Sequence, residues 1–385
     1  MSFLKSVLEY DLHEINSEES FLKSLSYAKS EKLESTHKFT KVNIWGTKGL
    51  AIHIIDFCNR YGIEINSIFD SNIDNLGKVF HGRQIESPRQ NESPTIVCSY
   101  WTSRHIDLAQ KSIGENIFTP WEFMISLNDE TIWPWWNLRL PNNLSEDEIK
   151  YLRKTSERCI DNLSYTEFWK QVAARHMIGI IDSKNVGSDA PSTEYFVKRY
   201  TETKSSSIFL DLGAYDGDTI NRFFAQEITG GDNRKAVGIE ADLRNYLKLR
   251  ALSEVNPKIT PIHAAISDEN MLISFNENEH SLVNSGLSKV GKYIVPTVTI
   301  NQLFKADSFT QVKFDIEGFE RIALEGGSSA IKSKNAIWSV ASYHLYDDFW
   351  ILPRKFPRKY KIGVTSHAPR PWDTTFYFLK ESSKT

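Results

Sequence analysis

A short apolar run that ends in a glycine turn constrains the fold of this chain more than any other feature. Residues 208–210 are Ile, Phe and Leu, a pattern typical of a buried parallel strand. Asp211, Gly213 and Gly217 follow, and a helical pattern covers residues 219–226. Because Gly213 has no Cβ, the backbone can turn there and a ligand can approach it closely. This order predicts the first half of a nucleotide-binding βαβ unit, whose helix N-terminus offers N–H groups to an anion.

The spacing of the glycines indicates which nucleotide the turn would bind. The order Asp-x-Gly-x-x-x-Gly over residues 211–217 differs from the Gly-x-Gly-x-x-Gly of dinucleotide-binding turns. Asp216 and Asp218 would repel a pyrophosphate, whereas an acidic strand end suits a cation such as the sulfonium of S-adenosylmethionine. The next predicted strand, residues 236–239, ends in Glu240, which is placed to accept hydrogen bonds from ribose hydroxyls. The alternative is that these glycines and acids serve only a structural turn.

Composition narrows the class of protein. The 385 residues predict two domains or more, and 40% hydrophobic and 25% charged residues are ordinary for a globular protein. A net charge of −3 gives no reason to expect a nucleic-acid or membrane partner. Cys58, Cys98 and Cys159 form no Cys-x-x-Cys pair, which argues against a disulfide framework or structural zinc and fits a reducing compartment. Neither a signal peptide nor a transmembrane run is predicted, so we expect a cytoplasmic protein.

Four segments are predicted along the chain. They are N-terminal helices over residues 1–38, a Rossmann-like module over 39–117, a helical, tryptophan-rich bridge over 118–200, and the catalytic domain over 201–385. The N-terminal helices are amphipathic and fit either internal packing or a homodimer contact. In the bridge, Ser145 is predicted to cap a helix over residues 146–160 with Glu148 in the capping-box position, and a second helix is predicted over 166–178.

The predicted Rossmann-like module repeats the strand–turn–helix pattern without a complete nucleotide signature. A strand over residues 42–45, a helix over 50–61 and a strand over 63–69 are predicted, with Asp70 at the second strand end. The turn over residues 46–49 lacks Gly-x-Gly. We therefore expect a structural or substrate-presenting module. The alternative is a nucleotide- or sugar-nucleotide-binding protein, or an NAD-dependent oxidoreductase that uses this module.

A second informative stretch, residues 311–318, reads QVKFDIEG. Its predicted strand carries Lys313 and Asp315 two residues apart and thus on one side. Charges in a central parallel strand are costly unless they are paired or functional, and the carboxyl end of such a strand borders the ligand crevice of an open α/β sheet. Asp315 is therefore a candidate site residue, with a structural ion pair as the alternative. Residues 317–324 are predicted to form a helix that begins at Glu317.

Two histidines and one aspartate follow other predicted strands. His344 comes directly after a strand over residues 336–342, so its side chain is expected over the same edge as Asp315. Asp268 follows a strand over 260–265, where it either accepts from an adenine amino group or lies in a solvated turn. His367 lies in the loop of a closing hairpin and is expected at the surface without a role.

With these residues assembled, the chain resembles the FkbM family of S-adenosylmethionine-dependent methyltransferases. The resemblance begins at residue 205 and extends nearly to the C-terminus. The segments that carry it are FLDLGAYDGDT, VGIEAD, HAAISDEN, VKFDIEGFERIALEGG, and SYHLYDDFWILP with a later SHAP. The Lys-x-Asp-x-Glu-Gly string is the most characteristic. This sequence departs from the family at Ile300-Asn301, where members often carry Leu-Asp, and the N-terminal module lacks the usual Gly-x-Gly.

The resemblance implies an α/β fold with two Rossmann-like modules. The C-terminal one would be a class I methyltransferase fold, a seven-stranded, mostly parallel sheet with a closing hairpin. It further implies methyl transfer from S-adenosylmethionine to a hydroxyl of a sugar, polysaccharide or secondary metabolite. The implied cofactor-binding residues are Asp211, Gly213, Ala214, Tyr215, Gly217, Glu240, Ala241 and Asp268.

On the acceptor side, the resemblance implies catalytic roles for His344, Asp315 and Lys313. Substrate-binding roles are assigned to Glu317 and His367. A base within hydrogen-bond reach assists a poorly nucleophilic hydroxyl, so His344 is the candidate base, oriented by Asp315. No metal is assigned, because the spacing of these residues matches no recognised metal motif. A metal-dependent variant is the second choice, since carboxylates and imidazole are metal ligands.

Overall fold

The computed structural model describes residues 15–32, 39–47, 50–90, 92–98, 109, 111–114, 116–118, 120, 123, 126–127, 144–176, 193–275, 293–367 and 373–380. Its internal contacts divide the chain into two units. The first comprises Met1–Ile132, Arg139–Asn143 and Ala173–Val186, and the second comprises Trp133–Leu138, Leu144–Val172 and Gly187–Thr385. Among the described helices, none combines the length and the apolar content that a bilayer crossing requires.

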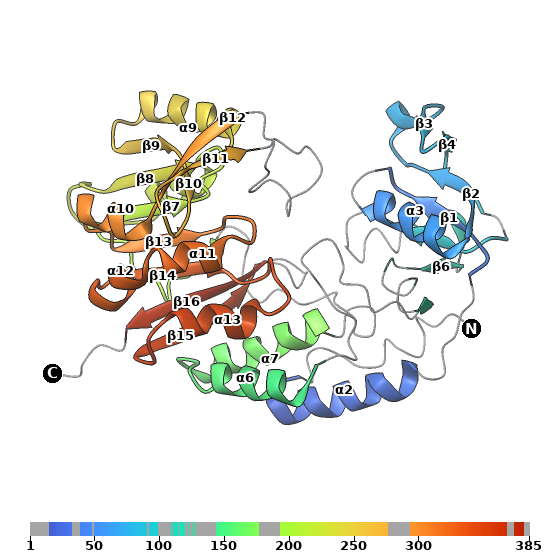
Figure 1. Ribbon diagram of the computed structural model, residues 1–385, viewed down its shortest axis with the longest axis horizontal. Helices are drawn as coiled ribbons and strands as arrows, with labels where there is room; N and C mark the ends of the chain where they lie inside the picture. The colour runs from blue at the N-terminus through green and yellow to red at the C-terminus, as the bar shows by residue number, and fades with distance from the viewer. Residues whose placement is uncertain are drawn as a thin grey trace. The chain divides into compact units, whose positions relative to one another are not determined.

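The N-terminal unit contains a mostly parallel sheet in the strand order β3-β4-β2-β1-β5-β6 (Figure 1), in which only the β3–β4 pair is antiparallel. Its described elements are α2 (Glu18–Lys32), β1 (Lys41–Trp45), α3 (Leu50–Tyr61), β2 (Glu64–Phe69), the 3-10 turn η2 (Ile73–Asn75), β3 (Val79–Phe80), β4 (Arg83–Glu86), β5 (Thr95–Val97) and β6 (Ile117–Phe118). Helix α3 has the bounds that its apolar spacing predicts, because Ala51, Ile54, Ile55 and Cys58 are all buried.

The C-terminal unit is built on a seven-stranded sheet in the order β15-β16-β14-β13-β7-β8-β9. Its strands are β7 (Ile208–Leu212), β8 (Lys235–Glu240), β9 (Ile259–His263), β13 (Gln311–Phe314), β14 (Ile337–Ala341), β15 (Tyr360–Ser366) and β16 (Thr374–Lys380). Five of these strands run parallel and β16 is antiparallel to both of its neighbours. This arrangement confirms the predicted seven-stranded methyltransferase-type sheet with a closing hairpin.

Helices and a small second sheet complete the C-terminal unit. The helices are α6 (Glu146–Ser156), α7 (Asn162–His176), α8 (Asp218–Phe224), α9 (Leu243–Val255), α10 (Ile300–Ala306), α11 (Glu320–Glu325), α12 (Ser328–Ser333) and α13 (Asp348–Lys355). Figure 1 shows α11 beside α13, and α13 rests on the sheet through Phe349, whose ring centroid lies 5.0 Å from that of Phe376. The second sheet consists of β10 (Ala265–Ile266), β12 (Tyr293–Val298) and β11 (Leu272–Phe275).

The strand order places a topological switch point between β7 and β13. From β7 the chain continues outward to β8 and β9, and β13 then pairs with the other side of β7. In this pairing Phe314 stands opposite Leu212, so the two strands end at the same level. In open α/β sheets, ligands bind in the crevice beyond the carboxyl ends of the strands at such a point. The fold therefore directs attention to the turns after β7, β8, β13 and β14.

Helix α6 shows how local sequence positions the bridge. Ser145 caps it and Glu148 bonds back to the backbone of Ser145, which confirms the predicted capping box. At its C-terminal end the Arg158 guanidinium donates hydrogen bonds to the carbonyls of Pro357 and Tyr360, 3.1 Å away in each case. Residues 144–172 consequently group with the C-terminal unit.

The structure corrects several predicted element bounds. Helix α11 begins at Glu320 rather than Glu317, because Glu317 and Gly318 have φ values of 57° and 95°, outside the helical range. Strand β12 ends at Val298, since Thr299 caps a helix, α10, that the sequence analysis did not predict. The strand predicted over 260–265 is divided, and its end joins the small sheet as β10.

Candidate functional site

The turn after β7 lies against the turn after β13. A Cβ on Gly213 would stand 1.9 Å from the carbonyl oxygen of Asp315, and the φ of Gly213 is +79°. Such an overlap with backbone cannot be relieved by a side-chain movement, so only glycine fits at this position. The two segments that the sequence singles out, residues 211–217 and 311–318, therefore meet at the switch point of the sheet.

A buried ion pair supports both turns. The ammonium of Lys313 lies 3.0 Å from Oδ1 of Asp211 and donates a hydrogen bond to the carbonyl of Gly213 over 2.6 Å. The side chains of Asp211 and Lys313 are 0% and 5% exposed. Burial raises the pKa of Asp211 to about 6 although Lys313 opposes the shift. Burial alone would lower the pKa of Lys313, but the carboxylates of Asp211 and Asp315 raise it.

Glu240 is held at the end of β8 by backbone donors. Its Oε1 accepts a hydrogen bond from the N–H of Asp242, and its Oε2 accepts one from the N–H of Tyr215, both over 2.8 Å. Burial raises the pKa of Glu240 to about 7, and these hydrogen bonds offset only part of that effect. The carboxylate thus joins the glycine turn to the second strand end, where a ribose would be recognised.

The other predicted cofactor-binding residues surround this turn in different environments. Tyr215 is exposed with a φ of 49°, whereas Ala214 is fully buried. Gly217 has a φ of +89°, and a Cβ there would stand 2.6 Å from a methyl group of Leu252. The carbonyl of Ala241 lies 3.1 Å from Nε2 of His263. Asp268 is exposed and accepts a hydrogen bond from its neighbour Ser267.

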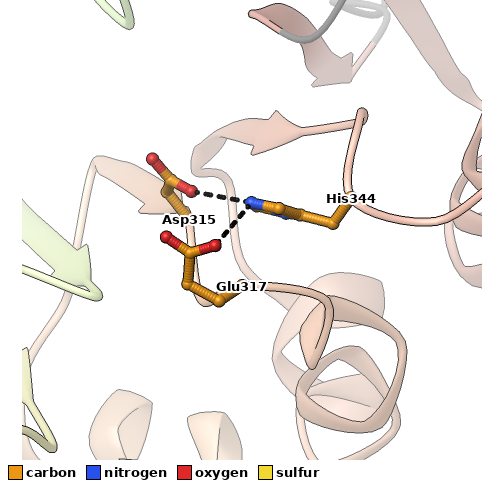
Figure 2. A group of neighbouring side chains, drawn as sticks. All are labelled: Asp315, Glu317 and His344. Carbon is orange, nitrogen blue, oxygen red and sulfur yellow. Dashed lines mark ion pairs between the residues drawn. The ribbon is translucent and has the colours of Figure 1, made fainter. Parts of the chain in front are cut away.

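Two carboxylates and an imidazole converge beyond β13 and β14. We call Asp315, Glu317 and His344 the Asp–Glu–His group. Figure 2 shows one nitrogen of the imidazole facing both carboxylates, with Nε2 of His344 3.4 Å from Oδ1 of Asp315 and 3.4 Å from Oε2 of Glu317. The side chain of His344 is 5% exposed, whereas those of Asp315 and Glu317 are 24% and 41% exposed. The group therefore opens toward solvent on its carboxylate side.

Charges around the imidazole determine its protonation. Burial by itself would lower the pKa of His344, but the carboxylates of Glu320 and Glu317 outweigh burial and raise it well above its usual value. Burial would likewise raise the pKa of Asp315, but Lys313 and His344 lower it. At neutral pH both ring nitrogens of His344 are therefore protonated, and the carboxylate of Asp315 is ionised.

Residues that the sequence analysis did not assign to the site hold this group in place. Nδ1 of His344 lies 3.0 Å from Oε1 of Glu320, whose side chain is 1% exposed. Asp315 accepts hydrogen bonds from the hydroxyls of Tyr195 and Tyr343, over 2.9 Å and 3.3 Å. Burial and the charge of Asp315 raise the pKa of both tyrosines well above the usual value, so both remain donors. One feature of the sequence could have indicated Glu320, because it is a further carboxylate in the stretch that follows β13. No feature of the sequence indicated Tyr195.

One predicted substrate-binding residue has a different environment from the one expected. His367 is not a surface side chain: it is 3% exposed, and its Nε2 lies 2.8 Å from Oγ1 of Thr365. It follows β15, whose burial extends to the end of the strand. Its role in substrate binding stays a prediction.

In the N-terminal unit, the acid at the end of β2 is engaged by the protein itself. Asp70 accepts hydrogen bonds from the hydroxyl of Thr47, the amide of Asn75 and the N–H of Asn72. A ribose would have to displace these donors in order to bind Asp70. The geometry favours the structural interpretation of this module over the nucleotide-binding one.

Comparisons with known proteins agree with this geometry. The family model described as the methyltransferase FkbM domain matches residues 211–358. The crystal structure of methyltransferase FkbM from Methylobacillus flagellatus KT matches with a TM-score of 0.71 and 18% identity, covering 96% of this chain and 100% of that one. Fibrillarin from Aeropyrum pernix with bound S-adenosyl-L-methionine matches at a TM-score of 0.30 and 11% identity, over 46% of this chain and 68% of that one. No curated protein matches the chain. The first structural match shows a shared fold.

Proposed function

We propose that this chain, whose residues 211–358 match the methyltransferase FkbM domain, transfers the methyl group of S-adenosylmethionine to a hydroxyl oxygen of a sugar, polysaccharide or secondary metabolite. One observation carries this proposal. The cofactor-type turn after β7 and the Asp–Glu–His group after β13 and β14 lie next to each other, because the backbone of Gly213 touches that of Asp315. A donor and an acceptor bound in these two halves would be neighbours.

The cofactor half consists of the turn after β7 and the end of β8. We assign Glu240 to the ribose hydroxyls, since its carboxylate faces the turn and accepts from the backbone of Tyr215. Gly213 and Gly217 supply the left-handed backbone that the turn requires. Asp211 is fully buried against Lys313, so we assign it to support of the turn rather than to contact with the cofactor.

The acceptor half is the Asp–Glu–His group. In methyl transfer the acceptor oxygen forms a bond to the methyl carbon while the carbon–sulfur bond breaks and sulfur keeps the electron pair. The positive charge is quenched, so alignment of the two reactants supplies much of the acceleration. The carboxylates of Asp315 and Glu317 can accept a hydrogen bond from a hydroxyl and direct its lone pair, which favours oxygen as the acceptor atom. In this proposal Nε2 of His344 first loses its proton to water and then accepts the proton of the acceptor hydroxyl.

We assign Lys313 a positioning role rather than contact with the acceptor. Its ammonium is buried, bonded to the carbonyl of Gly213 and paired with Asp211. From there it joins the two turns, and its charge lowers the pKa of Asp315.

A methyl-transfer assay tests the proposal. The full chain is incubated with S-adenosylmethionine that carries a labelled methyl group and with glycan and metabolite fractions of the source cells. We expect label in an ether that survives alkali, and a methoxy signal in the NMR spectrum of the product. Label on nitrogen or carbon, or no transfer to any fraction, would overturn the proposed O-methylation.

The His344→Ala variant tests whether His344 acts on the acceptor rather than on the cofactor. We expect it to lower turnover while the affinity for S-adenosylhomocysteine stays within about twofold, because His344 lies outside the cofactor half. The matched control is Glu325→Gln, an exposed carboxylate on α11 that pairs with Lys355. Unchanged turnover in His344→Ala would remove the imidazole from the mechanism.

A further inference from the structure

We infer that the Asp–Glu–His group binds one divalent cation of the Mg²⁺ or Mn²⁺ type. The binding site stands on the geometry of the three side chains. Its use in activating an acceptor hydroxyl rests on the proposed function above.

The separation of the ligand atoms fits a shared ion. One atom from each of Asp315, Glu317 and His344 can be chosen so that all three lie within 4.8 Å of one another. Adjacent ligands of an octahedral ion with bonds of about 2.1 Å stand about 3 Å apart, and opposite ones about 4 Å apart. The separations of 3.4 Å between Nε2 of His344 and each of the two carboxylate oxygens lie between these values. Figure 2 shows the imidazole nitrogen directed at both carboxylates rather than away from them.

Two of the three ligands, His344 and Asp315, are oriented by neighbouring side chains. The carboxylate of Glu320 lies against Nδ1 of His344, so the proton that stays on the ring is the one on Nδ1, and an ion that displaces the Nε2 proton binds that lone pair. Metal-binding histidines commonly have such a carboxylate partner, which fixes the ring and raises its basicity. Asp315 is fixed in the same way by the hydroxyls of Tyr195 and Tyr343. These contacts orient the ligands before any ion arrives.

The backbone at Glu317 is a second sign of a site. Its φ of 57° is a left-handed conformation that non-glycine residues seldom adopt, and Gly318 follows with a φ of 95°. Such conformations are energetically unfavourable and concentrate at functional sites. Here the turn follows Asp315 by two residues and leaves both carboxylates at the same imidazole nitrogen.

The charges in and around the Asp–Glu–His group also favour a bound cation. Among the described residues, His344 is the only ion-pair partner of Asp315, Glu317 and Glu320. The ammonium of Lys313 is engaged elsewhere, by the buried carboxylate of the β7 strand end. Three carboxylates, of which that of Glu320 is 1% exposed, thus share a single imidazole, and their mutual repulsion favours a bound cation. Two carboxylate oxygens and one imidazole nitrogen, with an open solvent side, suit an octahedral ion that retains exchangeable positions.

A bound cation would give the site its chemistry. Coordination of the acceptor oxygen lowers the pKa of its hydroxyl, whose proton leaves to water. The oxygen then forms its bond to the methyl carbon, the carbon–sulfur bond breaks, and sulfur keeps the electron pair. The products are the methyl ether, S-adenosylhomocysteine and one proton. In this arrangement His344 is a ligand rather than the base.

Titration of the metal-free full chain with MnCl₂ tests the site. The chain is treated with EDTA, dialysed and titrated while the electron paramagnetic resonance signal of free Mn²⁺ is recorded. We expect one saturable site per chain. Echo modulation of the bound Mn²⁺ should show a directly coordinated imidazole nitrogen, which disappears in His344→Ala. Saturable binding without a nitrogen signal, or no saturable binding at millimolar Mn²⁺, would overturn the inference.

Three variants assign the ligands. Glu317→Gln should weaken Mn²⁺ binding at least tenfold, and the half-exposed position of this side chain makes misfolding a minor concern. Glu320→Gln, in a positioning residue, should weaken binding by ten- to a hundredfold while the nitrogen signal remains. Glu325→Gln on the same helix should bind within twofold of the wild-type chain. Equal affinity in Glu317→Gln and the wild-type chain would contradict the assignment. The wild-type titration decides the question even if a variant fails to fold.

The outcomes separate this inference from the proposed function. Methyl transfer that survives EDTA in a chain without a Mn²⁺ site would refute the cation and leave the methyltransferase proposal intact. A Mn²⁺ site in a chain that methylates no acceptor would refute O-methylation and leave the cation site intact.

Discussion

Replacing Lys313 by Met tests the role of the buried ion pair. The change removes the ammonium that lies 3.0 Å from Asp211 and bonds to the carbonyl of Gly213, and leaves a carboxylate that is 0% exposed. Breaking a buried pair by removing one partner costs about 3–5 kcal/mol. At about 2–4 °C per kcal/mol for a unit of this size, the unfolding temperature should fall by roughly 6–20 °C.

The pH dependence of this loss identifies its cause. Without Lys313, the pKa of Asp211 in the folded chain rises further above its unfolded value, because burial already raises it to about 6. A raised carboxyl pKa destabilises the fold above that pKa, and the penalty disappears as the pH falls through it. Lys313→Met should therefore recover part of its stability between pH 7.5 and about pH 5.5, relative to the wild-type chain at each pH.

Differential scanning calorimetry of the full chain measures these effects. Lys305→Met, on the exposed face of α10, is the matched control and should change stability by about 0.5 kcal/mol or less. The double variant Asp211→Asn with Lys313→Met should be more stable than Lys313→Met alone, because no buried charge remains. A stabilising role of the ion pair would be refuted if the free energy of unfolding of Lys313→Met lay within about 1 kcal/mol of the wild-type value. It would also be refuted if the losses of the single variants Lys313→Met and Asp211→Asn simply added in the double variant.

Three further predictions follow from single contacts. Binding of S-adenosylhomocysteine should weaken roughly tenfold from pH 8 to pH 6. The pKa of Glu240 is about 7, and only the ionised carboxylate accepts hydrogen bonds from both ribose hydroxyls. Calorimetry of Glu240→Gln should show no such dependence of the affinity on pH. Gly213→Ala should cost about 2–4 kcal/mol in urea unfolding, since its Cβ would overlap a carbonyl, whereas Gly230→Ala, with equally positive φ but open space, should cost only about 1 kcal/mol. Ser145→Ala should cost about 1 kcal/mol by the same measurement, and no change would remove the capping box from the stability of α6.

The parts of the fold that local patterns control were predictable. The apolar run at residues 208–210 and the glycine turn after it predicted β7 and the turn that carries the cofactor half. Helix α3 was predicted with its observed bounds because its buried positions recur at helical spacing and turns flank both ends. The placement of Asp315 and His344 on one edge followed from the parallel strands that precede them.

Contacts between distant parts of the chain were not predictable. The hydroxyl of Tyr195 reaches Asp315 across 120 residues, and no local pattern encodes such a pairing. The helix predicted from Glu317 begins three residues later, because a left-handed turn overrides the propensity of that residue. In α9, Leu247 is 45% exposed, while Leu249 is fully buried. Burial there depends on which neighbours the fold supplies, and periodicity alone does not show them.

The central claim is that the crevice beside β7 and β8 binds S-adenosylmethionine, and calorimetric titration of the full chain with S-adenosylhomocysteine tests it most directly. We predict saturable binding of one molecule of S-adenosylhomocysteine per wild-type chain and an affinity at least a hundredfold lower in Glu240→Ala. Titration with NAD should release no heat. Binding of NAD in place of S-adenosylhomocysteine, or equal affinity of the wild-type chain and Glu240→Ala, would contradict it.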